Sequence, residues 1–559
     1  MFKRSLRILS RNVRSQSTFQ GSKASVSAKL GYRIPIAGLV LGAAIGGSLA
    51  LCDYWSINND QFSSTTSLEE LQPPQYCQDE SEFNSAVEKL KAVLNNDSES
   101  FSDAKETLDS HSDTYFNSHH PTPEQRPGIV LFPHTTKDVS EIMKICHEHA
   151  IPVVPFSGGT SLEGHFVSTR CKFTVVLDLS MYMNKIIKLN DLDLDVEVQA
   201  GVPWEDLNDF LGEKNLLFGC DPGPGAQIGG CIANSCSGTK AYRYGTMKEN
   251  VVNITAVLAD GTIIKTKKRP RKSSAGYNLN GLLIGSEGTL AVVTEATIKC
   301  HVKPVKETVA VGSFPTVEAA AACTSRLIQE GIQLNAMELL DDNMMRVINR
   351  GGATYKTDWI EKPTLFFKIG GRNDNIISEV VSEVNRVANM HGCHKFEYAT
   401  NADEKMELWE ARKAALWSVI NEGKTKDESI NVWTTDVAVP LSRFSGVIEA
   451  TKEEMDSSGL KNAIVGHAGD GNFHAFILYN NQERSKATEL VDNMVKRAIA
   501  AEGTCTGEHG VGIGKRTFLL EELGDGPVNL MRSLKLAMDP KRILNPDKIF
   551  KIDPNDHEE

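Results

Sequence analysis

The stretch IPVVPFSGGTSLEGH, residues 151–165, decides the fold. Its first four residues are apolar, as in a buried strand, and they run directly into a turn of small residues. Small residues let backbone N–H groups converge on an anion, because a Cβ atom would hold the anion's oxygens away. The run has neither the G-x-G-x-x-G order of dinucleotide folds nor the G-K-S/T ending of a P-loop. Taken alone, it is either a turn or an anion site.

Two more segments rich in small residues follow. They are DPGPGAQIGGCIANSCSGTKAYRYGTMKENV, residues 221–251, and GLLIGSEGTLAVVTEATI, residues 281–298. Such stretches allow the backbone to approach a flat, extended ligand closely. Three of them in one half of the chain exceed what turns alone require, so we expect a shared ligand.

Composition narrows the class of protein. The chain has 559 residues, 40% of them hydrophobic, which predicts a globular protein of two or three domains. A net charge of -12 argues against nucleic-acid binding and suits a basic partner. The eleven cysteines include no C-x-x-C pair, so they predict neither a disulfide framework nor a thiolate zinc site.

The N-terminus has the features of a targeting segment. Residues 1–33 are rich in serine, lysine and arginine, and no acidic residue precedes Asp53. This pattern predicts a mitochondrial presequence, the alternative being a disordered basic tail. Residues 34–51, IPIAGLVLGAAIGGSLAL, form an uncharged run just long enough to cross a bilayer as a helix. The charge bias then predicts an inner-membrane anchor with the body in the intermembrane space.

The body changes character twice. Residues 52–120 are polar and acid-rich around one amphipathic stretch, which predicts an acidic linker running into a short helix. From about residue 124 to 301, strand, helix and many short β-rich pieces follow. The first helix has a capping-box pattern at Thr135 to Asp138 and an apolar face through Val139, Ile142, Met143 and Cys146. Beyond residue 301, strands alternate with long amphipathic helices. We expect a second domain over residues 302–551.

Two histidines bracket a turn in GHAGDGNFHAF, residues 466–476. If GDGN is a four-residue hairpin loop, His467 lies directly opposite His474, close enough for both imidazoles to bind one divalent ion. The alternative is two hydrogen-bonded core histidines beside a tight turn. A metal would need a third ligand from elsewhere.

Two later motifs offer partners for this pair. In GTCTGEHGVGIGKR, residues 503–516, Glu508 and His509 lie between glycines, as a site loop or as an ordinary polar loop. In WEARKAALWS, Arg412 offers a planar fork for a carboxylate, unless it is a solvated residue on an amphipathic helix.

In order and spacing, these motifs resemble the vanillyl-alcohol oxidase and p-cresol methylhydroxylase superfamily, and within it the D-2-hydroxyacid dehydrogenases, over about residues 82–551. The resemblance implies an α+β fold. A p-cresol methylhydroxylase-type (PCMH-type) FAD-binding domain of two α/β subdomains would span residues 124–301, and a C-terminal α+β substrate domain residues 302–551. We expect the FAD to be non-covalent, because no histidine directly follows the paired glycines Gly158 and Gly159.

The resemblance also implies which residues line the FAD. They are Ser157, Gly158, Gly159, Thr160, Ser161, Leu162, Gly164, Pro222, Gly229, Gly230, Ala233, Asn234, Ser237, Gly238, Gly245, Thr246, Gly288, Val293 and, in the closing segment AMDPKRILNPDKIF, Asn545. Where relatives have N-P-G-K, this chain has Asp547 in place of the glycine. The sequence therefore does not decide the conformation of this turn.

The same resemblance implies a metal centre and a base. His467, His474 and Glu508 would bind one divalent ion, zinc, manganese or iron, leaving positions for a chelating 2-hydroxyacid. His509, with an ordinary pKa of about 6.5, would accept the hydroxyl proton while hydride passes to the flavin. Arg412 would bind the substrate carboxylate. Asn472 would either contact the substrate or stabilise the turn.

The implied activity is oxidation of D-lactate to pyruvate, with the flavin reoxidised by ferricytochrome c, whose basic face suits an acidic protein. Two alternatives stay open. A D-2-hydroxyglutarate dehydrogenase would need a further cation for the second carboxylate. A membrane-tethered binding protein would keep the fold without turnover.

Overall fold

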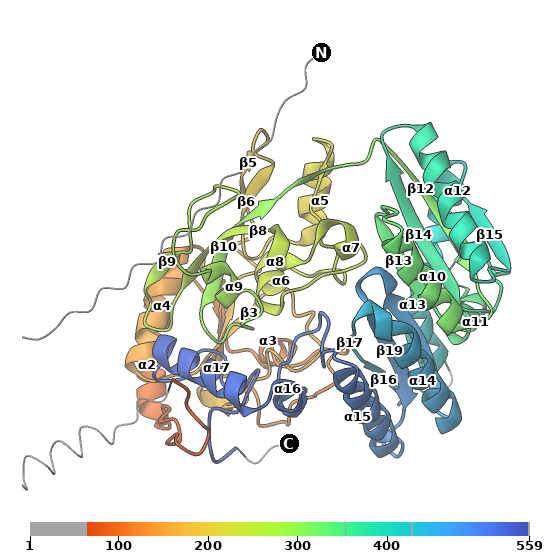
Figure 1. The fold of residues 1–559 in the computed structure, drawn as a ribbon. Coiled ribbons are helices and arrows are strands. Elements are labelled where there is room, and N and C mark those ends of the chain that lie inside the picture. The colour runs from red at the N-terminus through yellow and green to blue at the C-terminus, as the bar shows by residue number, and fades with distance from the viewer. Residues whose placement is uncertain (1–63, 353, 426, 428, 557–559) are drawn as a thin grey trace, which may run out of the picture. The chain divides into compact units, whose positions relative to one another are not determined.

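The computed structural model describes residues 64–352, 354–425, 427 and 429–556. The predicted presequence, residues 1–33, and the predicted membrane anchor, residues 34–51, lie outside these ranges. Among the described residues, no helix combines the length and the apolar character that crossing a membrane requires. The helix labels of the described residues begin at α2 (Figure 1).

The N-terminal lobe, residues 64–302, contains two main sheets, called the first and second sheets below, a separate two-stranded sheet of β7 and β11, and short helices. Its elements are α2 (Glu80–Val93), β1 (Phe101–Ser102), α3 (Lys105–Ser110), β2 (Ile129–Leu131), α4 (Thr136–Glu148), β3 (Val153–Phe156), η1 (Cys171–Phe173), β4 (Val175–Asp178), β5 (Ile186–Asn190), β6 (Asp195–Gln199), α5 (Trp204–Gly212), β7 (Leu216–Leu217), α6 (Ile228–Asn234), α7 (Ala241–Tyr244), α8 (Met247–Asn250), β8 (Val251–Val257), β9 (Ile263–Lys265), α9 (Leu279–Leu283), β10 (Val292–Lys299) and β11 (His301–Val302).

The first sheet has the order β1-β2-β4-β3, with β2, β4 and β3 parallel and β1 antiparallel at the edge. The short strands β2 and β4 are wholly buried, as parallel strands covered on both faces are. Helix α4 begins with the predicted capping box of Thr135 and Asp138 and buries its predicted apolar side. β3 ends where the glycine-rich loop at residues 157–164 begins.

The segment predicted as a linker is folded, and its packing begins just before α2, where Cys77 is buried. Helix α2 buries Phe83, Ala86 and Leu90 in the same core cluster as α4, and β1 pairs with β2. The amphipathic spacing predicted the helix, but the pairing of β1 depends on a distant strand. The packed unit therefore begins before the predicted boundary at residue 124.

The second sheet has the order β5-β6-β10-β8-β9 and is antiparallel throughout. Helix α6, in the middle of the glycine-rich segment, buries Ile228, Cys231 and Ile232 in the same core cluster as β10. Its C-cap, Ser235, is left-handed, which turns the chain sharply after the helix. The two predicted subdomains correspond to these two sheets.

The C-terminal lobe, residues 306–510, contains one large sheet and long helices. Its elements are β12 (Lys306–Ser313), α10 (Val317–Gln329), β13 (Ala336–Leu340), α11 (Asp342–Gly351), β14 (Thr364–Gly371), α12 (Asp374–Met390), β15 (Lys395–Tyr398), α13 (Ala402–Lys424), β16 (Asn431–Thr434), β17 (Val437–Ala438), α14 (Leu441–Ser458), β18 (Lys461–His467), η2 (Ala468–Asp470), β19 (Asn472–Tyr479) and α15 (Arg484–Ala500).

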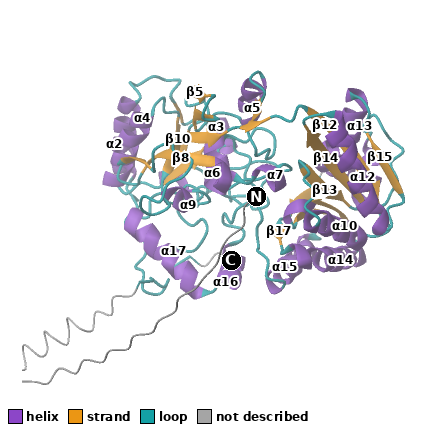
Figure 2. Cartoon of the chain, turned by 45° about the horizontal axis from the view of Figure 1, so that its top comes forward, coloured by secondary structure: helices purple, strands orange, loops and turns teal. Residues whose placement is uncertain are grey.

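Helices cover both faces of this third sheet, whose order is β15-β12-β14-β13-β18-β19-β16, with β17 also paired to β19 (Figure 2). Helices α10, α12, α14 and α15 share one core cluster with the sheet. Helices α11 and α13 share another core cluster with the strand side chains that point to the opposite face of the sheet. Val465 belongs to the second cluster, so His467, two residues later in β18, lies on the α13 face.

The closing segment, residues 511–556, leaves the C-terminal lobe and packs on the N-terminal one. After α16 (Arg516–Leu523) and α17 (Asp525–Met538), the chain runs parallel to the start of β3. Val153 N donates to Ile543 O at 2.8 Å, and Asn545 N donates to Val153 O at 2.8 Å. The last part of the segment predicted as substrate domain is thus integrated with the first sheet.

The hairpin of the two histidines has a different register from the predicted one. His467 pairs with Asn472, and Val465 pairs with His474, because the loop is Ala468–Gly471 rather than GDGN. The expectation that the histidines oppose each other directly was wrong. A shift of two positions keeps both side chains on one face of the sheet, so they become diagonal neighbours.

Candidate active site

Three predicted metal ligands lie together at one end of the third sheet. The rings of His467 and His474 have centroids 5.4 Å apart. Glu508 Oε1 is 3.2 Å from His467 Nε2 and 3.3 Å from His474 Nε2. One oxygen and two ring nitrogens therefore converge on a single point, although β18, β19 and the loop after α15 supply them separately.

Each imidazole is oriented by a second partner on its other nitrogen. His467 Nδ1 lies 2.9 Å from Glu338 Oε1, and His474 Nδ1 lies 3.0 Å from the carbonyl oxygen of Thr435. An acceptor at Nδ1 fixes the proton there and turns Nε2 toward a metal. The set of two imidazoles and one carboxylate, with both Nε2 atoms close to Glu508 Oε1, fits a divalent ion.

The charges within this cluster support each other. Burial alone would lower the pKa of His467, but Glu338 and Glu508 raise it well above its ordinary value. Burial would likewise raise the pKa of Glu508, but His467 and His474 hold it well below its ordinary value. The His467 imidazole is thus the group that carries positive charge between these two carboxylates.

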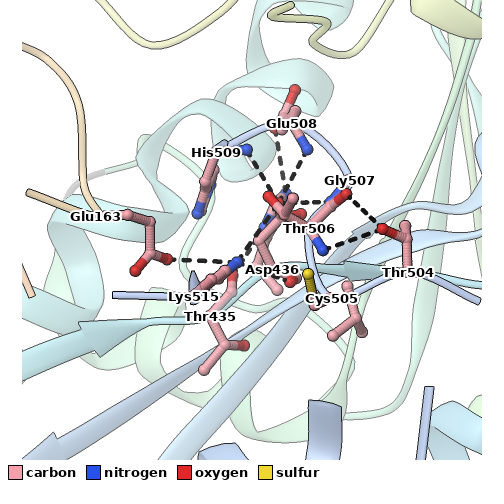
Figure 3. Close-up of polar contacts among 12 residues, drawn as sticks. Glu163, Thr435, Asp436, Thr504, Cys505, Thr506, Gly507, Glu508, His509 and Lys515 are labelled. Carbon is pink, nitrogen blue, oxygen red and sulfur yellow. Dashed lines mark hydrogen bonds and ion pairs between the residues drawn. The ribbon is translucent and has the colours of Figure 1, made fainter. Parts of the chain in front are cut away.

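A second triad, of Asp436, His474 and His509, also has its ligand atoms within 4.8 Å of one another. In it, His474 would have to use Nδ1, which already faces the Thr435 carbonyl. Asp436 accepts hydrogen bonds on both oxygens, five in all from the described residues (Figure 3). The first triad is therefore the better metal site.

The predicted base, His509, stacks on His474 with ring centroids 4.9 Å apart and an interplanar angle of 9°. Its Nδ1 is buried and has no hydrogen-bond partner among the described residues. Burial lowers its pKa to about 4, against the ordinary value assumed from sequence. At neutral pH the ring is therefore neutral, with a nitrogen available to a substrate.

Arg412 and Asn472 lie at the same end of the sheet, and both are already engaged. Arg412 Nε donates to Glu338 Oε2 at 2.7 Å, and Glu338 in turn contacts His467. Asn472 Nδ2 donates to Asp436 Oδ1 at 2.7 Å and to Val437 O at 2.8 Å. The Oδ1 atom of Asn472 is buried without a partner among the described residues, so this atom is the one a substrate could use.

The predicted FAD loops of the N-terminal lobe approach each other closely. A Cβ at Gly158 would lie 2.5 Å from Gly225 O, and one at Gly288 would lie 3.1 Å from the Pro155 ring. Asn234 Nδ2 donates to Ser161 Oγ at 3.4 Å. The three glycine-rich segments are thus joined to one another.

The first of these loops also has free donors. The N–H groups of residues 158–162 donate no hydrogen bond to another described residue, and the loop is half-buried. Consecutive free N–H groups in a loop that begins with two glycines form an anion cradle, which fits the pyrophosphate of FAD. Thr160, Gly230 and Ala233 also lie at contacts between these segments.

For the other predicted FAD residues, the described contacts do not join two of the three segments. They are Gly159, Leu162, Gly164, Pro222, Gly229, Gly238, Gly245, Thr246 and Val293. Thr246 caps α8, and Val293 lies in the core of the second sheet. Asn545 is better placed, because its Nδ2 donates to His165 O at 3.0 Å and to Glu287 O at 2.7 Å. It ties the closing segment to two predicted FAD loops.

The predicted flavin side and the predicted metal side touch. Ser237 Oγ donates to Glu508 Oε2 at 2.5 Å. Ser237 follows α6 in the second glycine-rich segment, and Glu508 is the third predicted metal ligand. The two halves of the site therefore face each other.

Sequence reasoning missed two buried carboxylates, Glu338 and Asp436, each wholly inaccessible to solvent. Glu338 holds both His467 and Arg412, and Asp436 holds the loop of Glu508 and His509. Each is an acid inside an apolar strand-like run, AMELL and WTTDVAV. A lone carboxylate in such a run is the signal that could have found them, because buried charges need partners.

Asp547 resolves the doubt about the closing turn. It adopts the left-handed φ of 69° that a glycine would adopt readily. Its carboxylate accepts from Arg170 Nε at 2.8 Å and from Thr169 Oγ1 at 2.7 Å. The side chain therefore ties the turn to the N-terminal lobe.

Glu163, at the end of the first FAD loop, gives a prediction for acid stability. Burial raises its pKa, but Lys515 at 3.3 Å and His119 at 3.2 Å outweigh burial and lower the value from 4.5 to about 2. A depressed folded-state pKa contributes stability above pH 4.5 that is lost as the pH falls toward 2. By linkage it amounts to about 3 kcal/mol.

Glu163→Gln should therefore flatten the acid side of the stability curve. We expect it to be less stable than the unaltered protein near pH 6, with the difference shrinking toward pH 3. Urea unfolding midpoints across this range measure it. A constant difference at every pH would show that Glu163 stays charged, or stays neutral, throughout.

Comparison with known proteins assigns the family. The FAD binding domain family matches residues 127–267, and the C-terminal domain of FAD linked oxidases matches residues 303–549. Over 495 residues the chain is 68% identical to the mitochondrial D-lactate dehydrogenase [cytochrome] of Kluyveromyces lactis, covering 89% of this chain and 86% of that one. It is 66% identical to D-lactate dehydrogenase [cytochrome] 1 of Saccharomyces cerevisiae, covering 89% and 85%.

Solved structures agree on the fold. p-Cresol methylhydroxylase superposes with a TM-score of 0.70 at 17% identity, covering 85% of this chain and 98% of its own. The 4-ethylphenol oxidase of Gulosibacter chungangensis gives 0.68 at 17% identity, covering 87% and 99%. The chain is thus an FAD-linked oxidoreductase of PCMH-type fold. It belongs to the family of the mitochondrial D-lactate dehydrogenases [cytochrome].

Proposed function

We propose that this protein oxidises D-lactate to pyruvate with FAD as the immediate electron acceptor and ferricytochrome c as the final one. The observation that carries the proposal is the hydrogen bond from Ser237 to Glu508, which joins the predicted flavin side to the predicted metal side. The two yeast relatives, both named D-lactate dehydrogenase [cytochrome], supply the substrate and the acceptor.

Each residue of the site has a separate role. His467, His474 and Glu508 hold one divalent ion, for which zinc, manganese and iron are all suitable. When bound, FAD supplies the hydride acceptor, and the ion supplies a Lewis acid for the substrate hydroxyl. His509 accepts the hydroxyl proton at its unpartnered buried nitrogen.

Arg412 and Asn472 orient the substrate. The Arg412 fork is anchored through Nε to Glu338, which leaves its terminal nitrogens for a carboxylate. Because Glu338 also holds His467, the same residue sets the carboxylate site and one metal ligand. The buried Oδ1 of Asn472 accepts a hydrogen bond from the substrate.

The protein acts at the mitochondrial inner membrane. Residues 1–33 form a presequence and residues 34–51 an anchor, which place the catalytic body in the intermembrane space. A net charge of -12 attracts the basic face of cytochrome c there and makes the association depend on salt.

Steady-state reduction of ferricytochrome c tests this function. D-lactate should support it, and D-2-hydroxyglutarate should support it far less, because a second carboxylate requires a further cation. The comparison uses kcat/KM for both acids on the flavin-loaded protein. A higher value for D-2-hydroxyglutarate would favour the alternative substrate. No reduction with either acid would favour a binding protein.

A further inference from the structure

The loop that carries Glu508 and His509 is bonded to one buried carboxylate. Asp436 Oδ2 accepts from the N–H groups of Gly507 at 2.7 Å, Glu508 at 2.9 Å and His509 at 2.9 Å (Figure 3). It also accepts from Thr506 Oγ1 at 2.8 Å. Three consecutive N–H groups that converge on one oxygen form an anion nest, and here the anion belongs to the chain itself.

The surroundings hold Asp436 in place. Its side chain is fully buried, and Oδ1 accepts from Asn472 Nδ2 at 2.7 Å. Lys515 Nζ donates to its main-chain oxygen at 3.1 Å and lies 3.3 Å from Glu163 of the N-terminal lobe. The carboxylate therefore has little freedom to move, and the loop bonded to it has equally little.

Gly507 makes this approach possible. A Cβ on Gly507 would lie 2.2 Å from Asn472 Nδ2 and 3.0 Å from Asp436 Oδ1, which is closer than real contacts allow. Any other residue would push the loop away from Asp436. The glycine before Glu508 is thus explained by the carboxylate beneath it.

The far end of the loop is held by the other lobe. Glu287 Oε1 accepts from Val511 N at 2.6 Å, and Glu287 Oε2 accepts from Gly512 N at 2.8 Å. Glu287 is buried and adjoins Gly288 of the third glycine-rich segment. Glu508 and His509 therefore lie between two anchors, one in each lobe.

We propose that Asp436 is the positioning residue of this site: it aims Glu508 at the two histidines and His509 at the substrate. The inference rests on the proposed function. Asp436 acts through the loop, because both of its oxygens are engaged and it has no direct role as a metal ligand. Glu508 depends on it, since the main-chain N–H of Glu508 itself is one of the bonds.

Asp436→Asn is the sharpest test, because it keeps the shape and removes the charge. If its oxygen faces the three N–H groups, its amide nitrogen meets the Asn472 amide, so two donors face each other. If the nitrogen faces the loop instead, it meets three N–H donors and the Thr506 hydroxyl. Either arrangement loosens Glu508 and His509.

The matched control is Asp341→Asn. Asp341 is equally buried in the same lobe, and its Oδ1 accepts from Met344 N at 2.8 Å and Ile464 N at 3.1 Å. It caps α11 and lies outside the site. Both variants lose a buried carboxylate that bonds backbone N–H groups, so both lose stability. Only Asp436→Asn should change the metal site.

The measurement is Mn²⁺ affinity of the flavin-loaded protein, followed through the electron paramagnetic resonance of free Mn²⁺. We expect Asp436→Asn to weaken binding about 10- to 100-fold and Asp341→Asn to leave it unchanged, as for other residues that orient metal ligands. Thr506→Val removes one donor to the same oxygen and is the milder variant if Asp436→Asn does not fold. It should weaken binding about two- to fivefold.

Unchanged Mn²⁺ affinity in Asp436→Asn, or in Thr506→Val if only that variant folds, would overturn the proposal. An equal loss in Asp341→Asn would overturn it too, since the effect would then be general destabilisation. If the unaltered protein binds none of manganese, zinc and iron, the proposed metal site has failed separately. The rate of flavin reduction by D-lactate then decides, and Asp436 keeps its role only if Asp436→Asn is slowed while Asp341→Asn is not.

Discussion

Replacing His509 with glutamine should leave a yellow, folded, metal-binding protein whose flavin D-lactate reduces about 10²- to 10⁴-fold more slowly. Glutamine has a similar volume, so the loop bonded to Asp436 keeps its shape. An amide cannot accept a proton as an imidazole does. The missing acceptor therefore affects the chemical step and leaves the binding of FAD unchanged.

Anaerobic stopped-flow absorbance of the flavin measures this rate, and the flavin-to-protein ratio checks loading. His394→Gln is a suitable control, because His394 is an exposed histidine of the same lobe. A rate for His509→Gln close to that of the unaltered protein would remove His509 as the base.

Replacing Glu508 with glutamine should have the second large effect, on metal binding. Glu508 is the only carboxylate of the proposed ligand set and the point where both Nε2 atoms converge. Residues that merely orient ligands cost about 10- to 100-fold in affinity, so the loss of a ligand should cost at least about 100-fold. Flavin reduction by D-lactate should fall with it.

Metal analysis of the purified protein and Mn²⁺ titration measure the effect. Glu502→Gln, in which an exposed glutamate near the same loop is changed, serves as the control. Treating the unaltered protein with a chelator should mimic Glu508→Gln, and added divalent metal should restore only the unaltered protein. If Glu508→Gln keeps both its metal and its rate, the ligand set is wrong.

The features that depend on neighbouring residues were the ones that the sequence predicted best. The capping box and apolar spacing of α4 involve neighbouring residues, so the helix could be predicted with its buried side. Small residues at the three loops predicted a shared ligand for the same reason. The motif around His467 and the motif around Glu508 each indicated a site residue, and the resemblance to known dehydrogenases linked them.

What could not be predicted depends on contacts between distant strands. Glu338 reaches His467 only because β13 pairs with β18. Asp436 reaches the loop of Glu508 across some seventy residues of sequence, and the closing segment joins β3 across nearly four hundred. The hairpin register was missed because η2 and Gly471 tighten the turn, which the letters GDGN did not reveal.

Anaerobic mixing of the flavin-loaded protein with D-lactate tests the central claim most directly. The account predicts that D-lactate bleaches the flavin, that L-lactate does not, and that ferricytochrome c then restores the colour. The two lactates carry the same groups but differ in configuration at C2. The comparison therefore tests only how Arg412, His509 and the metal ligands orient the substrate. A flavin that stays oxidised in D-lactate, or that L-lactate reduces equally fast, would contradict it.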